Sequence, residues 1–346
     1  METRDLKTRA VRFSRVLMIL FSVPLVLGLL KDWHPALDSL SHFRAHLAVL
    51  LGLTALPVLV GAAWKEGATA LALAIASLLT VTGLPGLPGS TPVRAAADPD
   101  TRAMYRLLQL NLRFDNRTPE RVLSLIGRTK PDAITLEEVS TKWIPILDRL
   151  SAAYPYRVIC PSDELIGGVA ILSRRSFQGV GATYCYGEGS LAVAAVNFGG
   201  SRVEVAAMHL SWPWPFRQPR QINDLAPALG ALADTALLAG DLKATGWSAA
   251  VAHVAEAGDL TPIRAIGPTW LHRSLPPALR RWVGLPIDQV LAKGNVLVRS
   301  VTVQEEAGSD HLPVLVEFSL LAGAPPADEE RQAVTTAPTQ THRPTS

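Results

Sequence analysis

The stretch Gly308-Ser-Asp310-His311-Leu-Pro-Val314 decides which fold this sequence predicts. The apolar run 314–318 that follows is a strand candidate, rich in Val and ending in Phe. Asp310 and His311 therefore stand directly before a strand that we expect to be buried. Polar groups near a core cost free energy unless they are paired, so two of them here need a chemical reason. We infer that they belong to a functional site.

Outward from this stretch, short β-type runs alternate with helical patterns. The predicted strands are 104–110, 133–136, 169–172, 191–196, 203–208, 237–239, 287–291, 296–303 and 314–318. One predicted helix begins at Pro119, and two others cover about 141–152 and 221–234. Strands and helices mixed on this scale indicate a layered α/β sandwich.

Polar residues recur at the ends of these strands or just after them. They are Asn111, Glu137, Glu138, His209, Asp241, Asp288, Asp310 and His311. Loops at one edge of a sheet are where α/β folds build their sites. The sequence therefore predicts one polar site at such an edge.

Seven blocks together resemble the endonuclease/exonuclease/phosphatase superfamily of metal-dependent phosphoesterases. They are Gln-Leu-Asn111, Thr135-Leu-Glu-Glu138-Val, Gly168-Val-Ala-Ile-Leu-Ser173, Val205-Ala-Ala-Met-His209-Leu, Ala239-Gly-Asp241-Leu-Lys-Ala-Thr, Pro286-Ile-Asp288-Gln-Val-Leu and the Gly308 stretch. The resemblance covers 102–320. It implies a four-layer α/β sandwich, in which helices flank two packed β-sheets.

The resemblance also implies a metal site. Glu138 matches the main metal carboxylate, with Asn111 and Asp310 beside it. Phosphoester hydrolysis needs a water nucleophile and neutralised charge on the phosphoryl oxygens. A hard cation with few protein ligands meets this need, so we expect Mg²⁺ or Mn²⁺ as the cofactor.

The remaining matched residues are assigned to catalysis by the same resemblance. Asp241 matches the residue that orients or deprotonates the attacking water. His209 and His311 match imidazoles that contact the phosphoryl oxygens, and Asp288 matches a further acid near the phosphate. His253 and His272 match no block and receive no role.

Three positions depart from the family pattern. Lys243 stands where the family has Asn, and it either supplies positive charge to the phosphate or pairs with Asp241 and inactivates it. We favour the phosphate contact and count Lys243 as catalytic. Gln289 stands where His is common. Glu137 stands where Gln is common, and we expect it either behind the site or facing solvent.

The composition predicts a membrane segment. The chain has 346 residues, 48% of them hydrophobic and only 18% charged, whereas a soluble domain has about 25% charged residues. Three apolar runs, 16–30, 45–64 and 67–86, approach the roughly 20 residues that a spanning helix needs. We predict three transmembrane helices over 16–86. A signal peptide followed by two spans, and a buried helical core, are the alternatives.

The net charge predicts the orientation. Residues 1–15 hold five basic and two acidic side chains, so this tail accounts for the whole net charge of +3. The positive-inside rule places the tail in the cytoplasm, and three spans place everything after residue 86 outside. This arrangement resembles the membrane-tethered bacterial branch of the superfamily. We expect a multi-pass protein of the bacterial inner membrane, with a linker 87–101, an extracytoplasmic domain 102–321 and a disordered tail 322–346.

The charge and the aromatic residues narrow the substrate class. The neutral remainder of the chain argues against duplex DNA, whose binding needs many Lys and Arg contacts. Segments 210–217 and 273–286 combine Trp, Phe and Leu with Arg, and either contact the membrane interface or fold onto the core. We expect a phosphorylated substrate, first a lipid-linked phosphate or diphosphate, then nucleotides or nucleic acid. The sequence identifies no protein partner.

The sequence thus predicts a membrane-anchored, extracytoplasmic phosphoesterase. A divergent domain that binds a phosphorylated ligand without turnover and an exported nuclease are the alternatives. An exported domain can pair Cys160 with Cys185, and two free thiols are equally compatible with the sequence.

Overall fold

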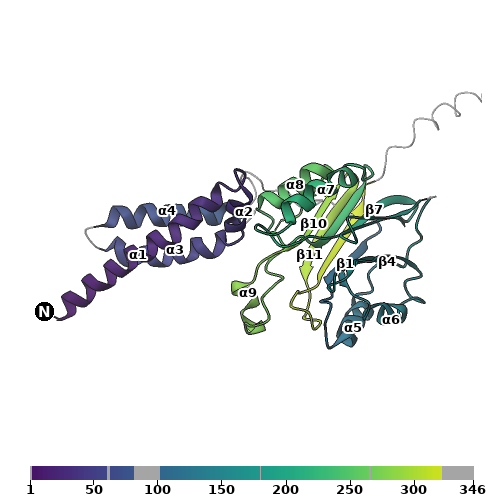
Figure 1. Cartoon of the computed structure of the whole chain (residues 1–346), viewed down its shortest axis with the longest axis horizontal. Helices are drawn as coiled ribbons and strands as arrows, with labels where there is room; N and C mark the ends of the chain where they lie inside the picture. The colour runs from purple at the N-terminus through teal and green to yellow at the C-terminus, as the bar shows by residue number, and fades with distance from the viewer. Residues whose placement is uncertain (1, 61–62, 82–101, 180, 265, 322–346) are drawn as a thin grey trace, which may run out of the picture.

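The computed structural model describes residues 2–60, 63–81, 102–179, 181–264 and 266–321. The N-terminal helices form an elongated bundle at one end of the molecule, and the α/β domain forms the other end (Figure 1). The predicted linker 87–101 and the predicted tail 322–346 lie outside the described residues.

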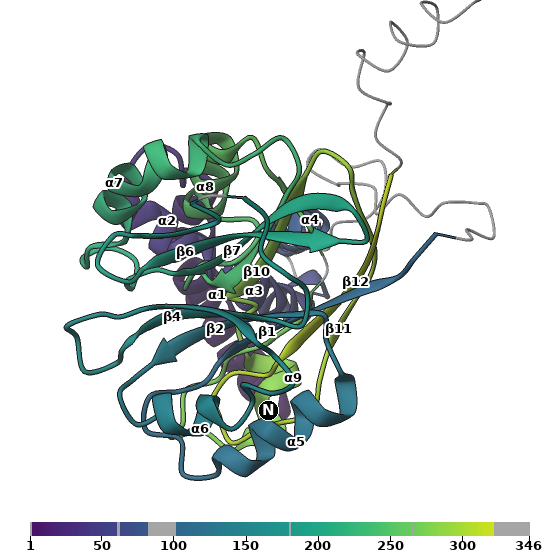
Figure 2. The same ribbon diagram turned by 90° about the vertical axis from the view of Figure 1, so that its right-hand side faces the viewer.

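Two six-stranded sheets pack face to face in the α/β domain (Figure 2). The first sheet has the order β11-β12-β1-β2-β4-β3, with β1 (Tyr105–Asn111), β2 (Ala133–Val139), β3 (Tyr156–Cys160), β4 (Gly168–Ser173), β11 (Val296–Val303) and β12 (Val314–Leu320). The second has the order β5-β6-β7-β8-β10-β9, with β5 (Thr183–Tyr186), β6 (Leu191–Phe198), β7 (Ser201–His209), β8 (Ala236–Asp241), β9 (Thr261–Pro262) and β10 (Asp288–Lys293). Their inner faces share one buried apolar core that includes Leu107, Val205 and Phe318.

Helices cover the outer faces of both sheets (Figure 2). The first sheet carries α5 (Pro119–Thr129) and α6 (Ile144–Asp148), and the second carries α7 (Gln218–Gly230) and α8 (Ala249–Gly258). A 3₁₀ turn, Pro277–Leu279, leads into the short helix α9 (Arg280–Val283). The predicted four-layer α/β sandwich is confirmed. The helix expected over 141–152 is shorter, because only α6 is helical there.

A disulfide joins Cys160, at the end of β3, to Cys185 in β5. These strands are edge strands of different sheets, so the bond links the two layers of the sandwich. Of the two alternatives left open by the sequence, the structure has the paired one.

The N-terminal bundle contains α1 (Glu2–Leu29), α2 (Pro35–Ser41), α3 (Arg44–Leu59) and α4 (Trp64–Val81). Among the described residues, α1 and α4 are long and apolar enough to cross a membrane. A third span arises only if α2 and α3, which meet at a bend of 61°, count as one. The predicted count of three is therefore not confirmed, because the run 45–64 forms a helix of only 16 residues.

The helix α2 attaches the bundle to the α/β domain. The Asp38 carboxylate accepts hydrogen bonds from the backbone N–H groups of Ala249 (2.8 Å) and Ala250 (3.0 Å), in the first turn of α8. The Trp247 indole donates to the Ser41 carbonyl oxygen at 2.7 Å. Both views show α2 beside α8 (Figures 1 and 2). The segment between β8 and α8 is therefore held by the N-terminal bundle.

Candidate active site

Strand pairing gathers the predicted polar residues at one edge of the sandwich. β1 and β2 are parallel and place Asn111 opposite Glu137, while β7 and β8 are parallel and place His209 opposite Asp241. β10 runs antiparallel to β8, so its first residue, Asp288, also lies opposite Asp241. Side chains from the ends of β1, β2, β7 and β8 and from the start of β10 therefore meet at the same edge.

A backbone irregularity at the end of β2 separates two consecutive carboxylates. The register with β4 shifts between Leu136 and Val139, and Glu138 has a left-handed φ of 56°. This conformation costs a non-glycine residue about 1 kcal/mol or more. The Phe114 N–H donates to Glu138 Oε2 at 3.0 Å. Glu138 is half-buried and Glu137 is fully buried, so of the two positions expected for Glu137 the structure has the one behind the site.

Gln109 connects Glu137 to the rest of the site. Its Nε2 donates to Glu137 Oε2 and to Asp288 Oδ1, both at 2.8 Å. Burial raises the pKa of Glu137 well above its ordinary value, and the charge of Asp288 raises it further. Glu137 is thus a buried, protonation-prone support. The sequence reasoning missed Gln109, whose inward position follows from the strand alternation of β1.

Glu138 and Asp241 converge with Asn111 and His209. Asn111 Nδ2 donates to Glu138 Oε1 at 3.1 Å and to Asp241 Oδ2 at 2.9 Å. His209 Nε2 lies 3.5 Å from Asp241 Oδ2 and 3.9 Å from Glu138 Oε1. This nitrogen is buried and has no hydrogen-bond partner in the described part of the chain.

The same cluster has the donors of a metal site. Glu138, His209 and Asp241 each offer one ligand atom, and these atoms lie within 4.8 Å of one another. Two carboxylates and an unpartnered imidazole nitrogen suit a divalent cation. The residues present therefore fit the metal that the family pattern implies.

A second group surrounds His311. Its Nδ1 lies 2.9 Å from Asp288 Oδ2, and its Nε2 lies 3.6 Å from Asp241 Oδ2. Burial alone lowers the pKa of His311, but the charges of Asp288 and Asp241 outweigh it and raise that pKa to about 10. For Asp241, burial raises the pKa, but His311, His209 and Lys243 outweigh it and bring the pKa well below its ordinary value. At neutral pH His311 is therefore a charged imidazolium beside the ionised Asp241 carboxylate.

Lys243 contacts Asp241 through its backbone rather than its side chain. Its N–H donates to Asp241 Oδ1 at 2.9 Å, and its φ of 48° is left-handed. The ammonium lies 5.0 Å from the centroid of the Trp212 ring. Among the described residues it forms no ion pair with Asp241. The direct pairing that would inactivate Asp241 is thus absent from this structure.

Asp310 lies apart from the Glu138 cluster. Its Oδ2 accepts a hydrogen bond from the Trp270 indole at 3.2 Å, and both residues line the same cleft as Glu138. Of the three residues expected at the metal, Asn111 and Glu138 are hydrogen-bonded to each other, and Asp310 lines the same cleft without joining their cluster. Trp270 was not predicted, because no motif marks a lone Trp in an irregular segment.

Gln289, the second departure from the family pattern, is buried beside this site. Its Nε2 donates to the carbonyl oxygens of Ala244 (2.9 Å) and Pro286 (2.7 Å). It therefore ties the segment after Asp241 to the segment before Asp288.

The cleft has a volume of about 490 Å³ and an aromatic, basic rim. The rim residues include Trp212, Phe216, Trp270, Arg113, Arg217 and Arg273. Trp212 is 40% exposed and Phe216 is 64% exposed, while Trp282 in the other predicted interface segment is 69% exposed. These aromatic side chains are not folded onto the core.

Both segments that carry the rim reach the N-terminal helices. In the first segment, the Trp214 carbonyl oxygen accepts a hydrogen bond from the Ser39 hydroxyl of α2 at 2.9 Å. In the second, Trp282 and Val283 line a cavity together with His46 of α3. The cleft is therefore bordered by two segments that touch the N-terminal bundle.

The family model described as the Endonuclease/Exonuclease/phosphatase family matches residues 108–311, which is more than half of the chain. No curated protein matches significantly.

Similar solved structures include an endonuclease/exonuclease/phosphatase from Bacteroides vulgatus, with 16% identity, a TM-score of 0.53 and coverage of 64% of this chain and 100% of that one. Another, from Beutenbergia cavernae DSM 12333, has 21% identity and a TM-score of 0.51, covering 63% of this chain and 72% of that one. D. rerio TDP2 complexed with a single-strand DNA product has 16% identity and a TM-score of 0.51, and the match covers 63% of this chain and 99% of that one. At these identities the likeness shows the fold.

Proposed function

The chain belongs to the endonuclease/exonuclease/phosphatase family, whose members hydrolyse phosphate esters, and we propose that it is a membrane-anchored, extracytoplasmic, divalent-metal-dependent phosphoesterase. The observation that carries the proposal is the convergence of Asn111, Glu138, His209 and Asp241 within one cleft. A non-catalytic fold would not need an orphaned imidazole nitrogen beside two carboxylates, because each such group is costly to bury.

Glu138 would hold the Mg²⁺ or Mn²⁺ ion, with Asn111 beside it and Asp310 in the same cleft. The bound ion would supply Lewis-acid neutralisation of phosphoryl oxygen charge. His209 and Asp241 offer further donor atoms in the same cluster.

Asp241 is held as an acceptor for the attacking water. The Lys243 N–H and the Asn111 amide fix both of its oxygens. Its lowered pKa makes it a weak base near neutrality, so it orients the water more than it deprotonates it. The charged His311, anchored by Asp288, and the Lys243 ammonium provide positive charge for the phosphoryl oxygens.

Metal dependence is the first test. The full-length protein in detergent is assayed on a synthetic phosphomonoester and a synthetic phosphodiester, with EDTA and then with added Mg²⁺ or Mn²⁺. We expect turnover that EDTA abolishes and metal restores. Binding of a phosphorylated ligand that is indifferent to EDTA, without turnover, would instead support the non-catalytic alternative.

A lipid-linked phosphate or diphosphate is the substrate class that we propose. The support is the rim of the cleft, since exposed Trp212 and Phe216 beside Arg217 and Arg273 suit a membrane interface. Polyprenyl diphosphate, phosphatidyl lipids and single-stranded DNA should be compared in one assay. Preference for the lipid substrates is expected, and preference for single-stranded DNA would establish the exported nuclease instead.

Two observations support the extracytoplasmic orientation. The Cys160–Cys185 disulfide is typical of an oxidising compartment. In addition, α3 packs in one apolar cluster with α1 and α4, as a third span would, through Leu25, Leu51 and Ala74. Three crossings from a cytoplasmic tail leave the α/β domain outside, whereas two would return it to the cytoplasm. A C-terminal reporter active only in the cytoplasm should therefore be silent, and an active one would overturn the orientation.

A further inference from the structure

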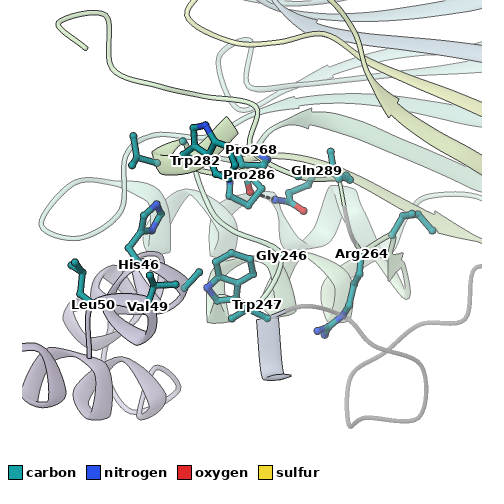
Figure 3. Close-up of a pocket in the computed structure, with 17 residues that line it drawn as sticks. His46, Val49, Leu50, Gly246, Trp247, Arg264, Pro268, Trp282, Pro286 and Gln289 are labelled. Carbon is teal, nitrogen blue, oxygen red and sulfur yellow. Dashed lines mark hydrogen bonds between the residues drawn. The ribbon is translucent and has the colours of Figure 1, made fainter. Parts of the chain in front are cut away.

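A second cavity, of about 500 Å³, lies between the N-terminal bundle and the α/β domain. Its lining on one side comes from His46, Val49 and Leu50 in the first two turns of α3. On the domain side it includes Trp247 and Trp282 (Figure 3). No residue assigned above to catalysis or to the metal lines it.

The α3 side of this cavity continues into an exposed apolar surface. Val49 is 49% exposed and Leu50 is 40% exposed, and both line the cavity. Leu53, one turn further along α3, is 59% exposed and does not line it. If the bundle spans a bilayer, these side chains face hydrocarbon, so a lipid chain lying along α3 reaches the cavity without crossing water.

Arg264 lies at one end of this apolar lining (Figure 3). Its Nε is buried and has no hydrogen-bond partner, and its guanidinium forms no ion pair within the described residues. The neighbouring domain-side lining is Ile263 and Ile266, which offer no counter-charge. A partly buried cation without a partner costs free energy, and an anionic group beside it would remove that cost.

We propose that this cavity is a binding site for an anionic bilayer lipid. The hydrocarbon chain would lie against Val49, Leu50 and Trp282, and the head-group phosphate would pair with Arg264. The proposal rests on the membrane anchoring in the proposed function, but not on catalysis. Because Trp247 lines this cavity and Lys243 lines the catalytic cleft, a bound lipid would lie behind the segment that follows Asp241.

The test uses the full-length protein in phosphatidylcholine nanodiscs. These contain a small fraction of phosphatidylglycerol or phosphatidylcholine with a photoactivatable diazirine in one chain. After irradiation, cross-linked peptides are quantified by mass spectrometry. We expect cross-links on residues 45–50 and 282–286, stronger for phosphatidylglycerol than for phosphatidylcholine.

Two variants with matched controls locate the site. Ala45→Phe narrows the cavity, whereas Leu53→Phe enlarges an exposed side chain on the same helix outside it. Arg264→Gln removes the cation, whereas Arg220→Gln removes an exposed arginine elsewhere. Ala45→Phe should remove the cross-links for both lipids. Arg264→Gln should lower only the phosphatidylglycerol yield, by about fivefold, as expected for one cation near a head group.

Each outcome decides the proposal. Equal yields for the two lipids, or no loss in Arg264→Gln, would overturn the anionic site, as would cross-links unaffected by Ala45→Phe. Turnover measured in the same nanodiscs separates this result from the proposed function. Cross-linking without turnover would leave the lipid site standing and remove the enzyme, while turnover without cross-linking would do the reverse.

Discussion

Two cavities of nearly equal volume, one polar and one apolar, use the segment 241–248 as part of their walls. In the cleft lined by Glu138, charged side chains pair with opposite charges, as His311 does with Asp288. In the apolar cavity a single cation, Arg264, has no partner among the described residues. The comparison indicates that charged groups of the described chain pair with one another in the cleft, whereas an anionic occupant beside Arg264 would supply the missing counter-charge in the apolar cavity.

The largest effect should come from Glu138→Ala. Loss of the main metal carboxylate should lower turnover by at least about 100-fold, because metal polarisation is worth several kcal/mol. Glu164→Ala is the matched control, since Glu164 lines the same cleft without joining the cluster. Initial rates at saturating Mg²⁺ measure the effect, and thermal unfolding checks the fold.

The comparison predicts that Glu138→Ala leaves lipid cross-linking of the apolar cavity unchanged. If the variant lost both turnover and cross-linking while remaining folded, the two cavities would be one functional site. If it kept near-native turnover, the assigned cluster would be wrong even though the fold is right.

His209→Ala and His311→Ala should each lower turnover by about 10- to 100-fold, the range for one charged hydrogen bond of about 1.5–3 kcal/mol. His253→Ala, on the exposed side of α8, should keep the native rate. The measurement is kcat together with KM, because phosphoryl contacts formed in the transition state affect kcat. Near-native rates in both site variants would remove the imidazoles from the mechanism.

Asp38→Ala tests the contact between the N-terminal bundle and the first turn of α8. The substitution removes both acceptors at the start of α8 and should lower the stability of the full-length protein by about 1 kcal/mol. For a domain of this size, that corresponds to a decrease in Tm of about 2–4 °C. The control is Asp32→Ala, which removes an exposed partner of Lys31.

Because α8 follows directly on the segment 241–248, Asp38→Ala should also lower turnover by a few-fold. Asp38→Asn keeps one acceptor and should restore part of both effects. A decrease in Tm without any change in turnover would mean that α2 holds the domain but does not position its catalytic segment.

The cleft could be predicted from sequence because strand ends bring distant residues together by a simple rule. Asn111, His209 and Asp241 end three apolar runs. Parallel pairing places Asn111 beside Glu137 in one sheet and His209 beside Asp241 in the other, and the packing of the sheets brings the two pairs together. The roles of Gln109 and Trp270 could not be predicted, since they depend on which side chains pack between the sheets and in an irregular segment.

The N-terminal bundle was harder to predict for a different reason. Hydropathy marks apolar runs but does not locate helix ends, so 45–64 was expected as one span and α3 ends at Leu59. The short strands β5 and β9 carry too few residues for a clear alternation. The apolar cavity joins α3 to domain segments that begin only at Gly246, and no local pattern encodes such an encounter.

The smallest effect concerns Lys243, which lines the cleft and belongs to the segment 241–248. Its left-handed backbone strains a long side chain, whereas Asn tolerates that conformation. Lys243→Asn should therefore raise stability slightly, by about 0.5–1 kcal/mol, as for other substitutions that fit their backbone better. It should keep or raise turnover, because Asn both donates to phosphate and accepts from neighbouring donors.

Lys243→Gly separates the backbone from the side chain. Glycine removes the strain and also the contact, so it should gain stability but weaken substrate binding, as Lys243→Ala should too. If the wild type is nearly inert and only Lys243→Asn hydrolyses substrate with metal, the lysine has inactivated the site despite standing over Trp212. If all three variants match an active wild type in KM and kcat, the ammonium plays no part. The charge for the phosphate then comes from the histidines and the metal alone.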